Sequence, residues 1–425
     1  MAFFDVVAVL MVLAAAFGWL NDRYTRLPIT VAVMAMGLAL SLALIALSLV
    51  YPQLKVDAER MLSTIDFDQV LLHGVLGFLL FAGALHIEYG DLREHRASIS
   101  VLAIVGTLLS TIIVGGLCWL IARPLGLELT AYHCLLFGAV VSPTDPIAVL
   151  AMLKSLGAPR HLEVQIAGES LFNDCAGVVI FIALLKFGDR PLALTRDLAW
   201  DVCLLVVREV FGGAALGLLL GLLAFWMLRR ADSYQVEILI SLALATGSYM
   251  WAERLHFSAP IAVVAAGLLV GNQGRAFEMA GRTRQHLDTF WELIDEILNA
   301  LLFVLLGLEM LILPIRPEHL LAGTLAIPAV LLARLLATGL SLRLIRGGAA
   351  PPPHIVTLLT WSGLRGGLAV ALALVLRDHL PVWQADVVLA MTYFVVVFSI
   401  LVQALTMKPL MRRYVRASGE GGGSP

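Results

Sequence analysis

Charged residues are scarce in this chain of 425 residues, in which Asp, Glu, Lys and Arg together make up 14%. A soluble domain has about 25%, so the composition excludes a soluble globular protein. The four cysteines lie apart in apolar segments, with neither metal-ligand spacing nor a disulfide framework. No cofactor fingerprint, phosphate loop or soluble catalytic domain is present. We therefore expect neither an enzyme nor a cofactor, and no nucleic-acid partner.

Apolar residues are abundant instead, at 60% of the chain. The N-terminus lacks the basic region of a cleaved signal peptide, so the first apolar run is expected to remain as a helix. Because a helix needs roughly 20 apolar residues to cross a bilayer, the sequence predicts an all-α polytopic membrane protein with about thirteen transmembrane helices. The expected spans are 3–20, 28–50, 66–87, 98–122, 130–153, 163–187, 200–228, 235–251, 258–271, 291–313, 319–342, 354–376 and 383–408. The arginine-bearing segment 274–290 is expected to form an interfacial helix.

Thirteen spans divide the loops into two alternating sets, one on each side of the membrane. Lys and Arg are concentrated in one of these sets, to which the C-terminal tail also belongs. Arg229, Arg230, Arg343 and Arg346 are examples of this richer set. The positive-inside rule assigns such loops to the cytoplasm. We therefore expect a multi-pass protein of the cell (inner) membrane, with its N-terminus outside and its C-terminus in the cytoplasm.

The most informative stretch is Gly168–Gly177, in which Glu169, Ser170, Asn173 and Asp174 open an otherwise apolar span. A charge near the bilayer centre costs on the order of 3 kcal/mol unless it is paired, hydrated or neutralised. This cost favours an ion or proton pathway. The alternative is a loop that merely precedes a helix.

Two spans are predicted to be interrupted. Pro143 and Pro146 lie in the middle of 130–153, and three glycines surround Arg365 in 354–376. Interior proline removes a backbone hydrogen bond, and glycine weakens a helix by about 1 kcal/mol. The first is the fifth of the first six spans, and the second is the fifth of the last six. Corresponding broken helices in two halves indicate a transporter site built from inverted repeats.

The segments Ser142–Leu150, Gly168–Asp174 and Gly363–Gly367 resemble the motifs of the sodium/proton exchanger family, in particular its electroneutral bacterial and archaeal branch. The resemblance covers the whole apolar chain in order and spacing. It implies crossed broken helices and a homodimer in the lipid bilayer. In each protomer, spans 1–3 and 8–10 would form the dimer domain, and spans 4–6 and 11–13 would form a moving core. The implied divisions are a first six-helix repeat at 1–187, a linker helix at 200–228, a second six-helix repeat at 235–408 and a short cytoplasmic tail at 409–425.

Asp174 is the best candidate for a carboxylate that binds either a cation or a proton. A hard monovalent cation prefers oxygen ligands, which Asp174, Thr144, Ser170 and the backbone freed by the prolines would supply. Asp145 is interpreted as a second carboxylate lining the site, nearer structural than titrating. Since Thr144 and Asp145 are strong capping residues, a helix cap at the break is the alternative, and it is compatible with a ligand role. The resemblance implies that Asn173 props the unwound backbone beside the ion.

Three further charges need partners, because an unpaired charge in hydrocarbon is expensive. The family pattern implies that Glu169 pairs with Arg334 of the eleventh span. Arg365 then offsets the negative ends of the half-helices at the second break. We interpret these three residues as structural charges of the core.

The sequence therefore predicts a secondary active antiporter that exchanges Na⁺, or K⁺ or Li⁺, for H⁺ by alternating access. Asn173 cannot carry a proton, so one cation is expected to displace one proton in an electroneutral cycle. The alternative is a sodium-coupled organic anion transporter of the same architecture, which would need more cationic groups than this carboxylate-rich cluster has. One departure from the family pattern is Ala82, where many relatives carry an acidic residue. That third carboxylate is absent here, or is replaced by Glu88 or His86.

Overall fold

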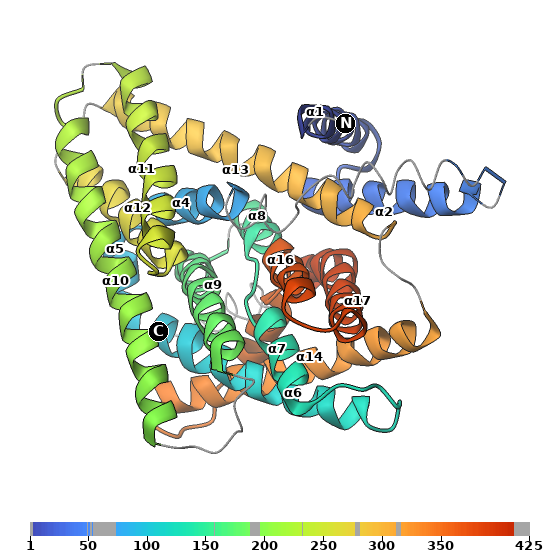
Figure 1. Ribbon diagram of the computed structural model, residues 1–425. Helices are drawn as coiled ribbons and strands as arrows, with labels where there is room; N and C mark the ends of the chain where they lie inside the picture. Colours follow the sequence, from blue (N-terminus) through green and yellow to red (C-terminus); the bar gives the residue numbers. More distant parts are fainter. Residues whose placement is uncertain are drawn as a thin grey trace, which may run out of the picture.

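The computed structural model describes residues 3–48, 50–51, 53, 74–156, 158–187, 196–231, 233–276, 281–311 and 316–411, and within these ranges it is helical and contains no β-strand (Figure 1). Residues 66–73 of the expected third span, loop residues Lys55, Arg60 and Arg190, and tail residues 412–425 lie outside the described part.

Long apolar helices make up most of the described chain, as expected where no water is available to bond exposed backbone groups. Seven of them are long and apolar enough to cross a membrane alone. The α-helices are α1 (Phe3–Leu20), α2 (Ile29–Ser48), α4 (Leu76–His86), α5 (Tyr89–Ser100), α6 (Thr107–Ala122), α7 (Ala131–Val141), α8 (Ile147–Leu156), α9 (Arg160–Phe187), α10 (Arg196–Leu228), α11 (Tyr234–Arg254), α12 (Ala259–Ala276), α13 (Gly281–Glu309), α14 (Pro317–Ile345), α15 (Pro353–Ser362), α16 (Gly367–Val375) and α17 (Val382–Phe398). Each expected span falls on one of these helices or on a broken or bent pair of them.

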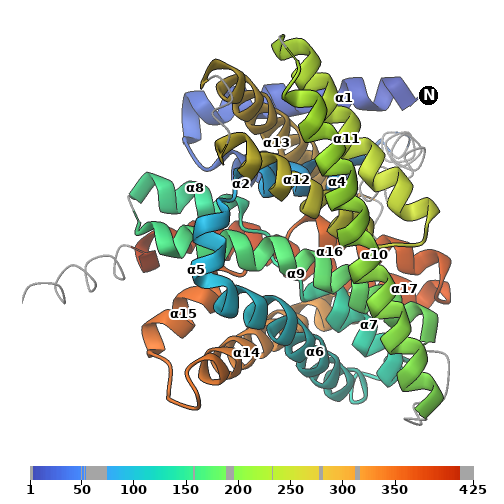
Figure 2. The ribbon, with the colours of Figure 1, turned by 90° about the vertical axis from the view of Figure 1, so that its left-hand side faces the viewer.

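Two boundaries differ from the sequence prediction. The interfacial helix expected in 274–290 is not a separate element, because α12 continues to Ala276 and α13 begins at Gly281 and runs on through span 10. No proline interrupts α13, so its charged first half and apolar second half form one helix of 29 residues, about 44 Å long. The fourth span begins earlier than expected, since α5, the π-helical turn η3 (Val101–Gly106) and α6 form one bent rod, with α9 lying across it in Figure 2.

Both predicted breaks are present, and they meet. The chain leaves α7 at Val141 and re-enters a helix at Ile147, while the second break separates α15 from α16. Where the two extended segments pass, Asp145 and Leu364 form an antiparallel bridge, in which Asp145 N–H donates to the Leu364 carbonyl at 2.8 Å. The proline and glycine residues at the breaks thus produce a crossing of two unwound segments, one from each half of the chain.

Small residues allow the helices around this crossing to approach closely, as is common in membrane bundles. Gly37 of α2 lies against Gly307 of α13, where a Cβ on Gly307 would come within 2.8 Å of the Gly37 Cα atom. Ser41 reinforces the contact by donating a hydrogen bond to the Gly307 carbonyl at 2.9 Å. α13 thereby spans the upper part of the view in Figure 1 beside α2, with α16 and α17 below it.

Candidate functional site

The first unwound segment is held against α9 by three hydrogen bonds. The Asn173 Oδ1 atom accepts from the Thr144 N–H at 3.1 Å, and Asn173 Nδ2 donates to Thr144 Oγ1 at 2.7 Å. Ser170, one turn earlier on α9, donates from its hydroxyl to the Thr144 carbonyl. These contacts satisfy backbone groups that a continuous helix would have bonded internally. The oxygens of Thr144 and Ser170 therefore already have protein partners, with lone pairs to spare.

Asp145 serves as a helix cap. Its Oδ1 atom accepts a hydrogen bond from the N–H of Ile147, the first residue of α8, at 3.0 Å. The other oxygen, Oδ2, lies against Gly366 of the second break, so closely that a Cβ at position 366 would overlap it. One oxygen of this carboxylate thus supports the fold, and the other faces the crossing.

Asp174 follows Asn173 on α9 and lies beside the same crossing. Its carboxylate interacts electrostatically with Asp145 and with Arg365. Within the described residues it accepts no hydrogen bond and forms no ion pair. A half-buried carboxylate without such a partner is expensive to keep charged, so this position favours binding a proton or a cation.

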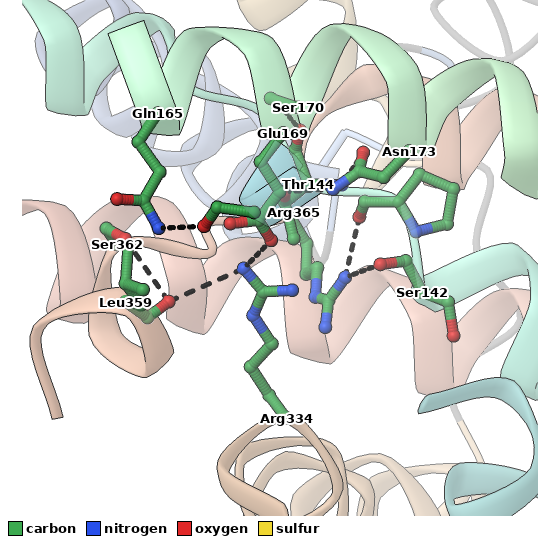
Figure 3. A network of polar contacts seen from close by, with 12 residues as sticks. Ser142, Thr144, Gln165, Glu169, Ser170, Asn173, Arg334, Leu359, Ser362 and Arg365 are labelled. Atoms are coloured by element: carbon green, nitrogen blue, oxygen red, sulfur yellow. Dashed lines mark hydrogen bonds and ion pairs between the residues drawn. The ribbon is translucent and has the colours of Figure 1, made fainter. Parts of the chain in front are cut away.

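The expected pair of Glu169 and Arg334 is present. Arg334 reaches from α14 and donates from Nη2 to Glu169 Oε1, and both side chains are almost fully buried (Figure 3). The same nitrogen also lies 3.4 Å from the Leu359 carbonyl at the end of α15. Gly363 makes room for this arginine, because a Cβ there would lie 2.7 Å from Arg334 Nε.

Arg365, in the second break, forms hydrogen bonds with the backbone of the first break. Its Nη1 atom donates to the carbonyls of Ser142 and Pro143, the latter at 2.7 Å. Figure 3 shows the guanidinium pointing toward Ser142. These carbonyls follow directly on the C-terminus of α7, where the helix dipole is negative. The backbone N–H of Arg365 is bound in turn by Ser399 Oγ at 3.0 Å.

Of the two proposed substitutes for an acid at Ala82, Glu88 does not lie at the crossing. Glu88 pairs with Arg160, at 2.7 Å, at the start of α9. Asp174 lies fourteen positions after Arg160 on α9, a rise of about 21 Å. The His86 ring contacts the Ala82 carbonyl at 2.7 Å, and Ala82 itself is buried in apolar packing.

One acidic residue near the site was not singled out from the sequence. Asp295 of α13 is close enough to Asp145 for their charges to interact. The sequence did contain a signal for this residue. Asp295 is followed four residues later by Asn299 within an expected span, and this spacing puts both polar side chains on one face of the helix.

Comparison with known proteins agrees with this geometry. The family profile described as sodium/hydrogen exchanger, transmembrane, matches residues 8–413. The chain is 46% identical over 418 residues to the Na⁺/H⁺ antiporter NhaP of Pseudomonas aeruginosa, with 96% of each chain covered. It is 34% identical to the Na⁺/H⁺ antiporter NhaH of Halobacillus dabanensis, with 88% of this chain and 91% of that relative covered. Its fold is similar to the sodium proton antiporter MjNhaP1 of Methanocaldococcus jannaschii, with a TM-score of 0.74 at 18% identity, covering 97% of this chain and 99% of that chain. The match of the family profile over nearly the whole length shows that this chain belongs to the sodium/hydrogen exchanger family.

Proposed function

We propose that Asp174 holds a Na⁺ ion and a proton alternately while this chain exchanges Na⁺ for H⁺ across the membrane. The observation that carries this proposal is a carboxylate without a hydrogen-bond partner in the described chain, placed beside two unwound segments. Members of the family are secondary transporters, so the chain is an antiporter and not an enzyme, and it needs no cofactor. Because one carboxylate cannot hold both ions at once, binding of one releases the other.

The remaining oxygens of the site fit the needs of a hard monovalent cation. We assign Asp174 as the ligand that titrates, with Thr144 and Ser170 supplying neutral oxygens and Asp145 its free Oδ2 atom. Asn173 holds the unwound turn in place through its two contacts with Thr144. K⁺ and Li⁺ would use the same ligands, with affinities set by the size of the site.

Glu169, Arg334 and Arg365 are assigned to the framework of the site. Their bonds connect α9, α14 and the two breaks, so the ligands and the crossing would move as one body. Such a body is what alternating access requires. In this proposal residues 1–187 and 235–408 are the two repeats, and 200–228 is the linker helix between them.

The cycle is proposed to be electroneutral. Asn173, next to Asp174, has no titratable group, and the Oδ1 atom of Asp145 is engaged in capping α8. One proton then leaves for each Na⁺ that enters, and the two loaded states carry equal charge.

The test uses purified protein in acid-loaded vesicles with a pH-sensitive dye inside. Addition of Na⁺ outside should alkalinise the lumen with the parent protein and leave it unchanged with Asp174→Asn. The matched control is Asp197→Asn, the same change at an exposed position in the first turn of α10, which should exchange normally. Exchange at the parent rate by Asp174→Asn, or Na⁺-coupled uptake of an organic anion without proton release, would overturn the assignment.

The chain is a multi-pass membrane protein, and two finer features belong to the proposal. The N-terminus is placed outside and the C-terminus in the cytoplasm, on the bias of Lys and Arg in the loops. Cysteine labelling of either terminus in intact cells tests this orientation. A homodimer through spans 1–3 and 8–10 is the proposed assembly, and the mass of the protein in small nanodiscs tests it.

A further inference from the structure

One face of α13 points toward the crossing. Leu302 of α13 packs so tightly on Gly367, the first residue of α16, that a Cβ at position 367 would overlap its side chain. Gly366, next to it, is the residue that lies against Asp145 Oδ2. Residues three and seven positions before Leu302 share its helix face. These residues are Asn299 and Asp295, so both line the approach to Asp145 along α13.

Asn299 is buried, with 2% of its surface exposed, and only half of its amide is bonded. Its Nδ2 atom donates to the backbone carbonyl of Asp295 at 2.8 Å, which turns the side chain toward that residue. The Oδ1 atom has no hydrogen-bond partner in the described chain. A buried amide oxygen without a donor is costly unless a ligand or water occupies the space beside it.

Asp295 is the partly buried acid on this face, and Glu292, three positions earlier, is exposed. The Asp295 carboxylate is half-buried, within reach of the Asn299 side chain, and close enough to Asp145 for the two charges to repel each other. A half-buried acid beside a second acid and an unbonded amide oxygen is an unfavourable arrangement when both acids are charged and no cation is bound. A monovalent cation among the three groups would offset the repulsion between the two acids and would give the Asn299 Oδ1 atom the partner that it lacks.

We propose that Asp295 and Asn299 form a second monovalent-cation site on α13, which a cation occupies with Asp145 Oδ2 on its way to Asp174. This proposal rests on the Na⁺/H⁺ exchange proposed above. Carboxylate and amide oxygens are the ligands that a hard cation prefers. Asp295 lies about 10 Å along α13 from Leu302, toward the start of the helix. That start follows a loop which the proposed topology makes cytoplasmic, so the second site lies on the cytoplasmic side of the crossing.

The Na⁺ dependence of exchange in vesicles tests the second site. For Asp295→Asn the KM for Na⁺ should rise about tenfold with kcat near the parent value, because the final ligand Asp174 is intact. For Asn299→Leu, which keeps the volume and removes the oxygen, it should rise about threefold. Asp295→Glu keeps the charge and should restore most of the affinity.

Glu296→Gln is the matched control, since it removes the next acid along the helix from an exposed position. Its KM should equal that of the parent protein. A general attraction of cations to a negative surface would affect both positions alike and would vanish at high ionic strength, whereas a direct ligand effect persists.

An unchanged KM in Asp295→Asn, or an equal rise in Glu296→Gln, overturns the second site. If Asp295→Asn does not fold, an unchanged KM in Asn299→Leu overturns the second site in the same way, and a threefold rise supports it. Parent exchange and its loss in Asp174→Asn are measured in the same vesicles. Failure of those two results would overturn the proposed function, whereas an unchanged KM in Asp295→Asn alongside them overturns only the second site.

Discussion

Removing either partner of the Glu169–Arg334 ion pair is expected to destabilise the protein by about 3–5 kcal/mol, because it leaves the other charge buried and unpaired. The burial supports the upper part of this range, since the Arg334 and Glu169 side chains are 5% and 3% exposed. Whole domains are stable by only about 5–15 kcal/mol. Glu169→Ala and Arg334→Ala should therefore each lower the yield of folded protein and the midpoint of thermal unfolding in detergent.

The pair of Arg377 and Asp386 provides an internal control. It has a similar geometry, at 3.1 Å, but its side chains are 34% and 16% exposed. Solvated pairs of this kind contribute about 0–1 kcal/mol. Arg377→Ala should accordingly leave the unfolding midpoint within a few degrees of the parent value.

The double variant Glu169→Leu with Arg334→Met tests whether the destabilisation comes from the buried charge left unpaired or from loss of the ion pair itself. Replacing a buried ion pair by apolar residues is often neutral or stabilising, so this variant should recover part of the loss seen in the single variants. The assay is size-exclusion chromatography after heating in detergent, for all variants in parallel. Single variants as stable as the parent, or a double variant that loses the sum of both effects, would refute the reasoning.

Three further outcomes are expected. Asp174→Glu should keep weak exchange with a shifted pH optimum, because the longer side chain changes its distance from Asp145, and a pH profile in vesicles measures this. Gly366→Ala should abolish exchange or raise the KM for Na⁺ at least tenfold, since the added Cβ overlaps Asp145 Oδ2; Gly116→Ala, with open space around its Cβ, should behave as the parent. A potassium potential set with valinomycin should drive no Na⁺ uptake, although about 2.3 kcal/mol per charge per 100 mV would be available to a charge-moving cycle; Na⁺ accumulation under that potential alone would contradict electroneutrality.

The sequence predicted the elements of the fold well where one strong local rule decides. Apolar runs of membrane length located the helices, and Pro143, Pro146 and the glycines around Arg365 located both breaks. The helix boundaries were less predictable. An apolar run ends at the first charged residues, but the helix can continue through them. α13 shows this clearly, since its charged first half continues the same helix.

Pairings across the two halves were harder to predict from residue patterns alone. The partnership of Glu169 with Arg334 was expected only through the family resemblance, because no local spacing connects residues 165 positions apart. Asp295 was missed for a related reason. Its proximity to Asp145 depends on how α13 packs on α16, which is a property of the folded chain.

The long separation between partners has a consequence for the synthesis of the protein. Glu169 is made 165 residues before Arg334, and Arg365 follows still later. At about 5–20 residues per second this delay lasts roughly 8–33 s. During that time the first half of the chain must enter the bilayer with its acidic residues and neither arginine. These acids are expected to insert as neutral carboxylic acids, and to ionise only once the second half arrives and the two breaks cross.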